Sequence, residues 1–462
     1  MFQEPIPIRI KRLWFRVQRK WKVSRFSRNV GLEGQVGRVL YNSFTGAIAA
    51  INHEEAIELG VLLEKGEVRG ELTGLASALG DIGFLVPEHT DELLEAQKLH
   101  ESMKDNTFMH LIVMPTEACN FRCTYCYQSF PHGSMSEETI QGLKNAVRDL
   151  TERISHLSLS WFGGEPLLAP EIIADLSASF IESCHAHNVE YVADMSTNGY
   201  HLTKERFQEM LRWQVRRFMI TLDGIGESHD RRRKLIGGQH TYERIVGNLL
   251  AIRDVEGSFE IDIRVNFDKQ NLMDVPELLK ELSALFKGDP RFQILIRPVG
   301  RWGGPEDDHI LVCDRTAADV HLWELTNYGI DQGIPLSVTI GDSLQPSGSV
   351  CYAAKPGSLV VSSSGSLHKC SIALDEEINK VGQLHSDGSM DLDVEKISVW
   401  TGSGEEMDTV CQSCYYRPAC QGNHCPLYRM RTGKRPCPHE KRKIKQVLNL
   451  LWKDANITKG TR

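Results

Sequence analysis

The sequence predicts an α/β protein whose parallel sheet is wrapped by helices and is either open or curled into a partial (β/α)6 barrel. The main observation is a regular alternation of apolar strands and amphipathic helices from about residue 107 to residue 300. The second is the composition, because 41% hydrophobic and 25% charged residues are typical of an ordinary globular protein. The third is that the alternation stops after residue 300, where Gly, Pro, Ser and Cys become frequent. In such folds ligands bind at the carboxyl ends of the strands.

The six predicted strands of the core are HLIVM, LSLSWF, VEYVADMS, RRFMITLD, FEIDIRVNF and FQILIRP. Helices are predicted between them at 136–150, 170–185, 203–213, 241–255 and 273–286. We divide the whole chain into a basic N-terminal segment (1–29), a small α+β unit (30–104), the α/β core (105–300), a bridging region (301–345), a cysteine-rich domain (346–440) and a C-terminal helix or tail (441–462).

The basic N-terminal segment has two interpretations. Lys and Arg dominate it, and the apolar residues Leu13, Trp14, Phe15, Val17 and Trp21 lie among them. It is either a solvated terminus or an amphipathic surface helix that meets an acidic peptide or a membrane face.

The small α+β unit shows four local signals. Residues 39–51 predict two short strands around an Asn-Ser/Thr-Gly turn, and a helix that ends at Gly66 follows. LTGLASALGDIGFLV predicts a helix that leads into a strand, and residues 91–104 predict a charged helix.

The net charge and the cysteine content limit the classes of partner and the cellular compartment that we expect. A formal net charge of −8 gives no electrostatic reason to expect a nucleic-acid partner. The start MFQEPIPIRI is unlike a secretory signal, and no apolar stretch has the length of a transmembrane segment, so we expect a cytoplasmic protein. Ten of the 12 cysteines fall in short-spaced groups, which in a reducing compartment indicates metal ligation rather than disulfides.

Cys119, Cys123 and Cys126 form the first of these groups, directly after the first core strand. Three thiolates on one tight loop can bind three irons of a [4Fe–4S] cluster and leave the fourth iron without a protein ligand. The alternative, a zinc knuckle, needs a fourth Cys or His nearby, and none follows within the usual few residues.

This CxxxCxxC spacing, with the aromatic Tyr125 before the last cysteine, resembles the signature of the radical S-adenosylmethionine (SAM) superfamily. The resemblance implies a partial TIM-like barrel, a SAM-binding [4Fe–4S] cluster, and reductive cleavage of SAM to a 5′-deoxyadenosyl radical. Further motifs of that family follow the next three strands. The residues that they imply for cofactor binding, with Tyr125, are Gly163, Gly164, Glu165, Ser196, Asn198, Thr221 and Arg233.

Each motif has its own implied role. The glycines let the backbone approach the ligand closely, and Glu165 accepts from the methionine ammonium of SAM. Ser196-Thr197-Asn198-Gly199 lies where the family reads the ribose hydroxyls and the methionine carboxylate. Thr221 replaces the usual Ser and keeps its hydroxyl. Arg233 lies in a basic run, and only its spacing from Thr221 distinguishes it.

The second cysteine group resembles the SPASM domain, which carries two auxiliary [4Fe–4S] clusters. The resemblance implies one cluster on Cys411, Cys414, Cys420 and Cys437, and another on Cys351, Cys370 and Cys425. The second set lacks a fourth ligand, so either Cys313 supplies it or one iron is open to a substrate thiolate. Cys184 lies on an amphipathic helix and is predicted to be a buried free thiol.

The overall pattern resembles peptide maturases that install thioether or carbon–carbon cross-links in ribosomally made precursor peptides. The partners implied are a precursor peptide or protein and an electron donor such as flavodoxin or ferredoxin. Residues 30–90 are then either a winged-helix unit that binds a leader peptide or a structural cap. The main alternative is an anaerobic sulfatase-maturating enzyme that makes formylglycine, against which Ser371 counts because that family has Asp there. A third class, a non-catalytic ferredoxin-like electron carrier, does not explain why the motifs for SAM binding are present.

Overall fold

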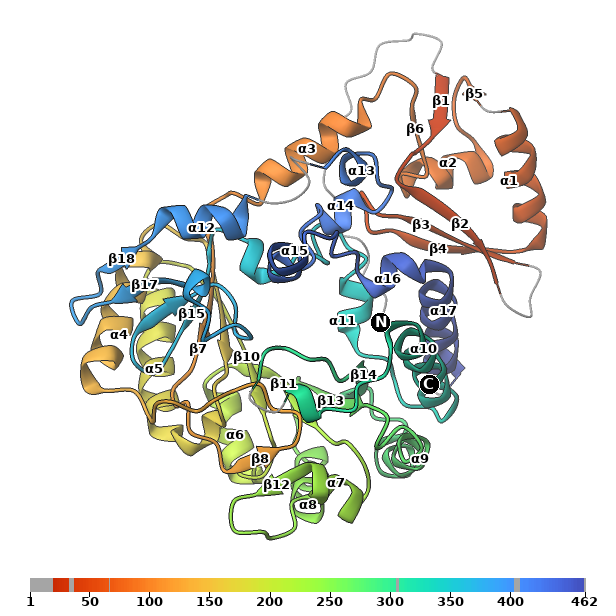
Figure 1. Ribbon diagram of the computed structural model, residues 1–462. Coiled ribbons are helices and arrows are strands. Elements are labelled where there is room, and N and C mark those ends of the chain that lie inside the picture. The colour runs from red at the N-terminus through yellow and green to blue at the C-terminus, as the bar shows by residue number, and fades with distance from the viewer. Residues whose placement is uncertain (1–19, 33–36, 66, 305–306, 403–407, 461–462) are drawn as a thin grey trace.

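The computed structural model describes residues 20–32, 37–65, 67–304, 307–402 and 408–460. Figure 1 shows the N-terminal unit at one end, the α/β core at the other, and helices of the cysteine-rich domain between them.

The N-terminal unit contains two three-stranded antiparallel sheets, β5-β1-β6 and β2-β3-β4. Its elements are β1 (Lys20–Val23), β2 (Ser27–Gly31), β3 (Arg38–Asn42), β4 (Ile48–Ile51), α1 (His53–Lys65), β5 (Val68–Arg69), α2 (Gly74–Asp81), β6 (Leu85–Pro87) and α3 (Glu92–Ser102). The predicted strands at 39–51 and the three predicted helices are confirmed; Gly66 lies outside the described residues.

One expectation for the basic N-terminal segment is wrong where the structure describes it. Lys20–Val23 is a strand rather than part of an amphipathic helix, because it pairs with both β5 and β6. Residues 1–19 lie outside the described residues.

The core is built on six parallel strands in the order β14-β13-β11-β10-β9-β7. The strands are β7 (Phe108–Val113), β9 (His156–Trp161), β10 (Glu190–Thr197), β11 (Val215–Thr221), β13 (Glu260–Phe267) and β14 (Phe292–Pro298). The helices are α4 (Glu137–Thr151), α5 (Pro170–Ala186), α6 (Lys204–Arg212), α7 (Glu227–Arg232), α8 (Tyr242–Arg253) and α9 (Val275–Phe286). The predicted strand–helix units are therefore confirmed.

The two faces of this sheet differ in chemistry. Leu159, Met195, Phe218 and Ile263 are buried in the main hydrophobic core, which also takes in the apolar sides of the helices. Most residues of the opposite parity on β9 to β13 are polar; for example, Ser160 donates a hydrogen bond to Asp194 on the next strand (2.8 Å). Because side chains alternate along a strand, the face away from the helices is a largely polar interior, with a small apolar cluster of Ile112, Met114 and Val360 near β7 and β15.

The cysteine-rich domain continues the same sheet. β15 (Ser358–Val361) pairs in parallel with β7 and extends the sheet to ten strands, with β14 and β18 at its two edges. The remaining elements are β8 (Phe121–Cys123), β12 (Arg233–Leu235), β16 (Ser366–His368), β17 (Lys380–Leu384), β18 (Met390–Leu392), α10 (Arg315–Asp331), α11 (Val338–Asp342), α12 (Val394–Thr401), α13 (Thr409–Gln412), α14 (Arg417–Cys420), α15 (Pro426–Thr432), α16 (His439–Arg442) and α17 (Ile444–Gly460). The sheet is thus a partial barrel and is not closed.

The N-terminal unit is anchored on the cysteine-rich domain. The hydroxyl of Ser43 donates to the carbonyl of Tyr415 (2.5 Å), and the guanidinium of Arg28 lies 3.5 Å from the centre of the Tyr415 ring. Tyr41 donates to the carbonyl of Leu344 (2.6 Å). The unit therefore contacts the chain directly beside Cys414.

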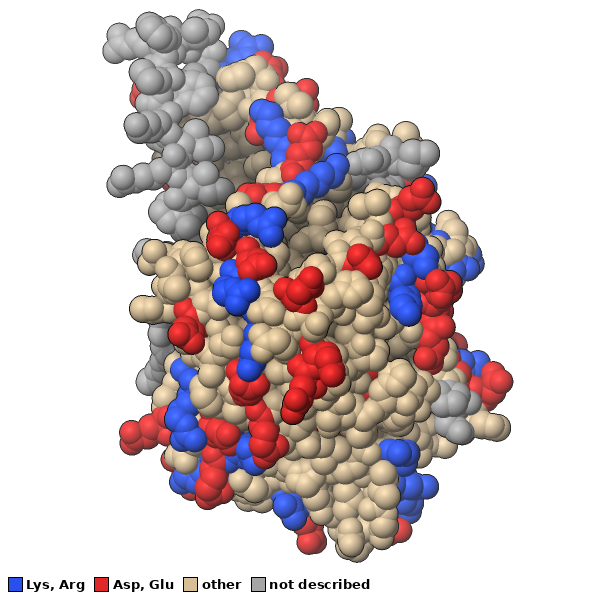
Figure 2. Space-filling view, turned by 90° about the vertical axis from the view of Figure 1, so that its left-hand side faces the viewer, with Lys and Arg blue, Asp and Glu red and all other residues tan. Residues whose placement is uncertain are grey.

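The face drawn in Figure 2 carries interspersed acidic and basic side chains rather than a patch of one sign. No helix in the described part of the chain is long and apolar enough to cross a bilayer.

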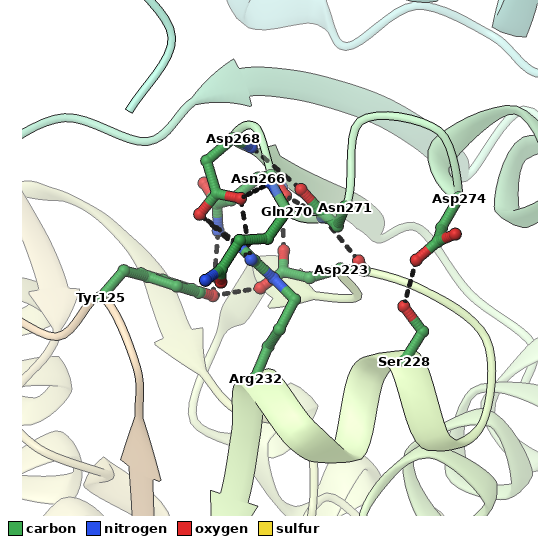
Figure 3. A network of polar contacts seen from close by, with 9 residues as sticks. All are labelled: Tyr125, Asp223, Ser228, Arg232, Asn266, Asp268, Gln270, Asn271 and Asp274. Atoms are coloured by element: carbon green, nitrogen blue, oxygen red, sulfur yellow. Dashed lines mark hydrogen bonds and ion pairs between the residues drawn. The ribbon is translucent and has the colours of Figure 1, made fainter. Parts of the chain in front are cut away.

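A buried ion pair connects α7 to the turn after β13 (Figure 3). The guanidinium of Arg232 donates to both carboxylate oxygens of Asp268, each at 3.0 Å, and both side chains are almost completely buried. Asp268 also accepts from the backbone of Gln270 (2.8 Å). Since α7 leads directly into β12, this ion pair helps to position Arg233.

We expect Arg232→Met to destabilise the protein by about 3–5 kcal/mol, because it leaves the Asp268 carboxylate buried without a counterion. Thermal unfolding of the metal-free protein measures this as a fall in midpoint. Arg231→Met is the matched control: Arg231 is exposed and pairs with exposed Glu227, so its effect should stay within about 0.5 kcal/mol. Equal midpoints for the two variants would contradict the role given to the ion pair.

Candidate functional site

The three cysteines of the CxxxCxxC loop lie at the carboxyl end of β7. Within the loop, β8 pairs antiparallel with β12, and this pairing places Arg233 directly opposite Cys123. The backbone N–H of Thr124 donates to the carbonyl of Arg232 (2.9 Å). The structure therefore brings Arg233 to the cysteine loop from more than 100 residues away.

The two glycines after β9 make room for the cysteine loop itself. A Cβ on Gly163 would lie 2.2 Å from the carbonyl oxygen of Thr116, and one on Gly164 would lie 2.3 Å from that of Ala118. Glu165 donates its backbone N–H to the same Ala118 carbonyl (2.9 Å). The close approach that these glycines allow is therefore one between two loops of the protein.

Glu165 is completely buried beneath this contact. One carboxylate oxygen accepts from the hydroxyl of Thr197 (2.7 Å) and the backbone of Leu167 (3.0 Å); the other accepts from the backbone of Asn198 (2.7 Å). Burial raises the pKa of Glu165, while these donors and the Arg233 guanidinium act against that rise. The second oxygen keeps acceptor capacity for a ligand, since a carboxylate has about four acceptor sites.

The cysteine thiols share this buried, charged environment. Burial raises the pKa of Cys119 to about 12 and that of Cys123 to about 11, and the Arg233 guanidinium opposes the rise at Cys123. The backbone N–H of Phe121 donates to Sγ of Cys119 (3.3 Å). Thiolates there require the positive charge of bound iron, so the buried thiols with their N–H and guanidinium donors fit a cluster.

The hydroxyl of Tyr125 lies in a polar network (Figure 3). It donates to Asp223 and accepts from the amide of Asn266 (3.3 Å). It also accepts from Arg233 (2.9 Å). Asp223 in turn accepts from the backbone of Asn266 (2.9 Å). This network connects the cysteine loop to the ends of β11 and β13.

Asn198 makes a similar connection from the end of β10. Its amide donates to the side chain of Asn120 in the cysteine loop (2.8 Å). Ser196 and Thr221 are half-buried on the polar face of adjacent strands, and Thr221 is in register with Arg264. The motif residues therefore converge on the carboxyl end of the sheet.

Four cysteines of the second group surround one cavity. Cys411, Cys414, Cys420 and Cys437 line it together with Arg435 and Lys441. Lys441 Nζ lies 3.4 Å from Sγ of Cys437, and the backbone of Tyr416 donates to Sγ of Cys414 (3.4 Å). Cys420 is buried and the other three cysteines are half-buried. These cationic and N–H donors around the thiols fit an anionic iron–sulfur cluster.

Cys351, Cys370 and Cys425 form a separate set. Chiefly burial, with contributions from Cys370 and Cys425, raises the pKa of Cys351 to about 12. Ile372 and Tyr428 donate backbone N–H groups to Sγ of Cys370 (3.5 Å) and Cys425 (3.4 Å). Among the described residues, no group of three or more His, Cys, Asp or Glu side chains is arranged to hold a single metal ion.

The two remaining cysteines lie elsewhere. Cys313 is near the end of β13, where burial raises its pKa, Asp268 and Asp314 add to the rise, and Lys269 opposes it. Cys184 is a buried thiol on α5, as predicted.

Several residues of this region have no role in the site predicted from the sequence. Asp223 and Asn266 hold the Tyr125 hydroxyl by hydrogen bonds, and Tyr127 lines a cavity together with His368 and Ile372. Burial raises the pKa of Tyr127, and Cys126 and Cys370 add to the rise. A Cβ on Gly304 would lie 2.4 Å from Cα of Tyr127, so residues near 304 cover the loop. The sequence offered one signal for Asp223 and Asn266, because both lie at the ends of predicted strands, where ligands bind in this class of fold.

Known proteins share the motifs that form this site. The family model of the radical SAM superfamily matches residues 113–282 of the sequence. Among curated proteins, the AdoMet-dependent heme synthase of Methanosarcina barkeri is 27% identical over 43% of this chain and 53% of its own length. The cysteine-type anaerobic sulfatase-maturating enzyme of Clostridium perfringens is 27% identical over 30% of this chain and 39% of its own length. The chain therefore spans about half or less of the length of these relatives, which are enzymes.

Among solved structures, native anSMEcpe with bound AdoMet and the Kp18Cys peptide matches with a TM-score of 0.55 and 17% identity, over 76% of this chain and 99% of that one. This likeness concerns the fold. Residues 113–282, with their cysteine loop and strand-end motifs, match the radical SAM superfamily and form a radical SAM domain.

Proposed function

We propose that this chain is a radical SAM enzyme of the SPASM type that modifies a peptide, forming a thioether or carbon–carbon cross-link in a ribosomally made precursor. The observation that carries the proposal is the convergence of Cys119, Cys123 and Cys126 with Glu165 and Arg233 at one end of the barrel. A fourth iron left without a protein ligand is where SAM would bind.

The chain's own residues would hold and orient the cofactor. Glu165 would accept from the methionine ammonium, while Ser196, Asn198, Thr221 and Arg233 would contact its other polar groups. Tyr125, with its hydroxyl fixed by Asp223 and Arg233, would present its ring beside the cluster. With cluster and SAM bound, one electron would cleave SAM to methionine and a 5′-deoxyadenosyl radical, which takes one hydrogen atom from the peptide.

The cysteines beyond residue 350 would hold two auxiliary [4Fe–4S] clusters. The cavity lined by Cys411, Cys414, Cys420 and Cys437 supports the four-cysteine ligand set. Cys351, Cys370 and Cys425 would hold the other cluster, and the position of Cys313 beside Asp268 and Lys269 favours an open iron there. Closing a cross-link after hydrogen abstraction releases one proton and one electron, and these clusters would accept the electron.

The N-terminal unit would bind the leader part of the precursor. Strands β2 and β4 are the edges of one of its sheets, to which an extended peptide can add. An apolar pocket lined by Trp21, Val23, Leu59, Leu79 and Leu85, among others, lies beside the other sheet. Flavodoxin or ferredoxin would supply electrons. A reducing cytoplasm would keep the cysteines from forming disulfides, so that they can bind the clusters.

An anaerobic sulfatase-maturating enzyme is the second candidate, because a curated relative and a solved structure with a similar fold have that description. Ser371 counts against it. Its hydroxyl lies 2.8 Å from the hydroxyl of Tyr352, and neither group is a carboxylate base. A short peptide gene beside this one would support the cross-linking enzyme, whereas a sulfatase gene there would favour the second candidate.

We expect Cys126→Ala to abolish SAM cleavage, because two thiolates cannot hold the primary cluster. Reconstituted, reduced protein is incubated with SAM, and 5′-deoxyadenosine is measured. Cys184→Ala removes a buried thiol outside the cysteine groups and should retain both iron and cleavage. Unchanged 5′-deoxyadenosine formation by Cys126→Ala would refute the site.

Gly164→Ala should lower both bound iron and SAM cleavage without removing any ligand. Its Cβ would overlap the carbonyl oxygens of Ala118 (2.3 Å) and Glu117 (2.4 Å) and displace the cysteine loop. Gly247→Ala is the matched control, since nothing lies within 4 Å of its Cβ position in α8. If both variants retain wild-type iron, the close approach does not position the cluster.

Cys414→Ala should remove about one cluster's iron and lower product yield while sparing part of the SAM cleavage, because the primary site remains intact. Iron content and 5′-deoxyadenosine are compared with those of Cys313→Ala, which should bind iron like wild type. Wild-type iron in Cys414→Ala would exclude an auxiliary cluster on the four-cysteine set.

A further inference from the structure

Two arginines lie on the polar interior face of the barrel, on adjacent strands. Arg264 of β13 alternates with Ile263 and Val265, and Arg297 of β14 follows Ile296; all three apolar residues belong to the core on the helix side. Asn266 is in register with Arg297 and Leu295 with Arg264. The two guanidinium groups are therefore diagonal neighbours that extend into the interior.

In the described part of the chain, neither guanidinium has a carboxylate partner. Arg264 donates to the side-chain oxygen of Asn266 (2.8 Å) and lies 3.7 Å from Sδ of Met219; Arg297 donates to the carbonyl of Ile296 (3.3 Å). Within the described ranges, no Asp or Glu lies within 4.0 Å of either one. Arg217, the third interior arginine, differs because it donates to Asp262 at 2.8 Å. Most of the N–H donors of Arg264 and Arg297 thus remain available.

The surroundings of Arg297 are short of negative charge. Burial lowers its pKa and the adjacent Arg264 lowers it too, while Glu440 and Asp262 act in the opposite direction. Asp262 is already engaged by Arg217, so Glu440 is the main carboxylate that acts on Arg297, and it also acts on His424 and His439. A half-buried pair of cations with no described carboxylate within 4.0 Å favours an anionic ligand.

The pair lies beside the reactive centre. Arg264 is in register with Thr221, and it acts on Tyr127, the residue that follows Cys126 and is also influenced by Cys370. A ligand on the two arginines would therefore lie between the primary cysteine loop and the second cysteine group.

We propose that Arg264 and Arg297 bind an acidic side chain of the substrate peptide, an Asp or Glu close to the residue that is modified. Guanidinium groups bind carboxylates with paired N–H···O hydrogen bonds, which fix both position and orientation. The inference rests on the proposed function, because it assumes that a peptide enters the barrel. The methionine carboxylate of SAM has the same chemistry and is the competing source of the ligand.

The test uses the reconstituted full-length protein with SAM and two pools of fluorescein-labelled octapeptides. The pools have identical random flanks and carry Glu or Gln at the fourth position; fluorescence anisotropy measures binding. Wild type should bind the Glu pool about tenfold more tightly, since hydrogen bonds between charged groups are lost with Gln. Arg264→Gln and Arg297→Gln should lose this preference, and Arg231→Gln, an exposed arginine, should keep it.

Equal binding of the two pools by wild type would overturn the inference, as would an unchanged preference in Arg264→Gln and Arg297→Gln. Equilibrium dialysis with SAM distinguishes the peptide carboxylate from the methionine carboxylate of SAM as the ligand of the two arginines. Variants that lose SAM binding but keep the Glu preference would identify the pair as part of the SAM site and overturn the inference. Formation of 5′-deoxyadenosine by wild type is measured independently. If SAM is cleaved but the pools bind equally, only this inference fails; if the Glu pool is preferred but SAM is not cleaved, only the proposed function fails.

Discussion

The close backbone contact between the cysteine loop and the turn after β9 determines the geometry of the whole site. Three cysteines on a loop can adopt many arrangements, and burial opposes their ionisation. Here Gly163 and Gly164 allow the carbonyls of Thr116 and Ala118 to approach within distances that any side chain would block. The same turn buries Glu165 beside the thiols. One contact therefore brings the ligands for a cluster and a carboxylate into the same space.

A second strand pairing completes this arrangement from the other side. β12 pairs with β8 and places Arg233 opposite Cys123, while Arg232, the preceding residue, forms a buried ion pair with Asp268. Neighbouring arginines in one basic run thus have different partners. The positive charge of Arg233 offsets part of the negative charge that thiolates and Glu165 would concentrate there.

The cysteine-rich domain is part of the same sheet rather than a separate appendage. Because β15 pairs with β7, Cys370 after β16 lies within reach of Tyr127 and the primary cysteine loop. The four-cysteine cavity lies farther along, beside the segment on which the N-terminal unit is anchored. The largely polar interior of the barrel carries Arg264, which is in register with Thr221 and acts on Tyr127 beside Cys126.

The sequence by itself determined the α/β class, the six strand–helix units and the cysteine groups, because hydrophobic periodicity and ligand spacing are local properties of the chain. It also selected Glu165, Thr221 and Arg233, though as members of motifs and not as neighbours. Only the tertiary structure decided that Arg233 faces Cys123, that Tyr125 is held by Asp223 and Asn266, and that Cys313 lies beside Asp268 and Lys269. It also decided that residues 20–23 are a strand and not a helix. These outcomes depend on strand pairing and burial between distant segments. The spacing of residues along the chain does not predict which distant segments come together.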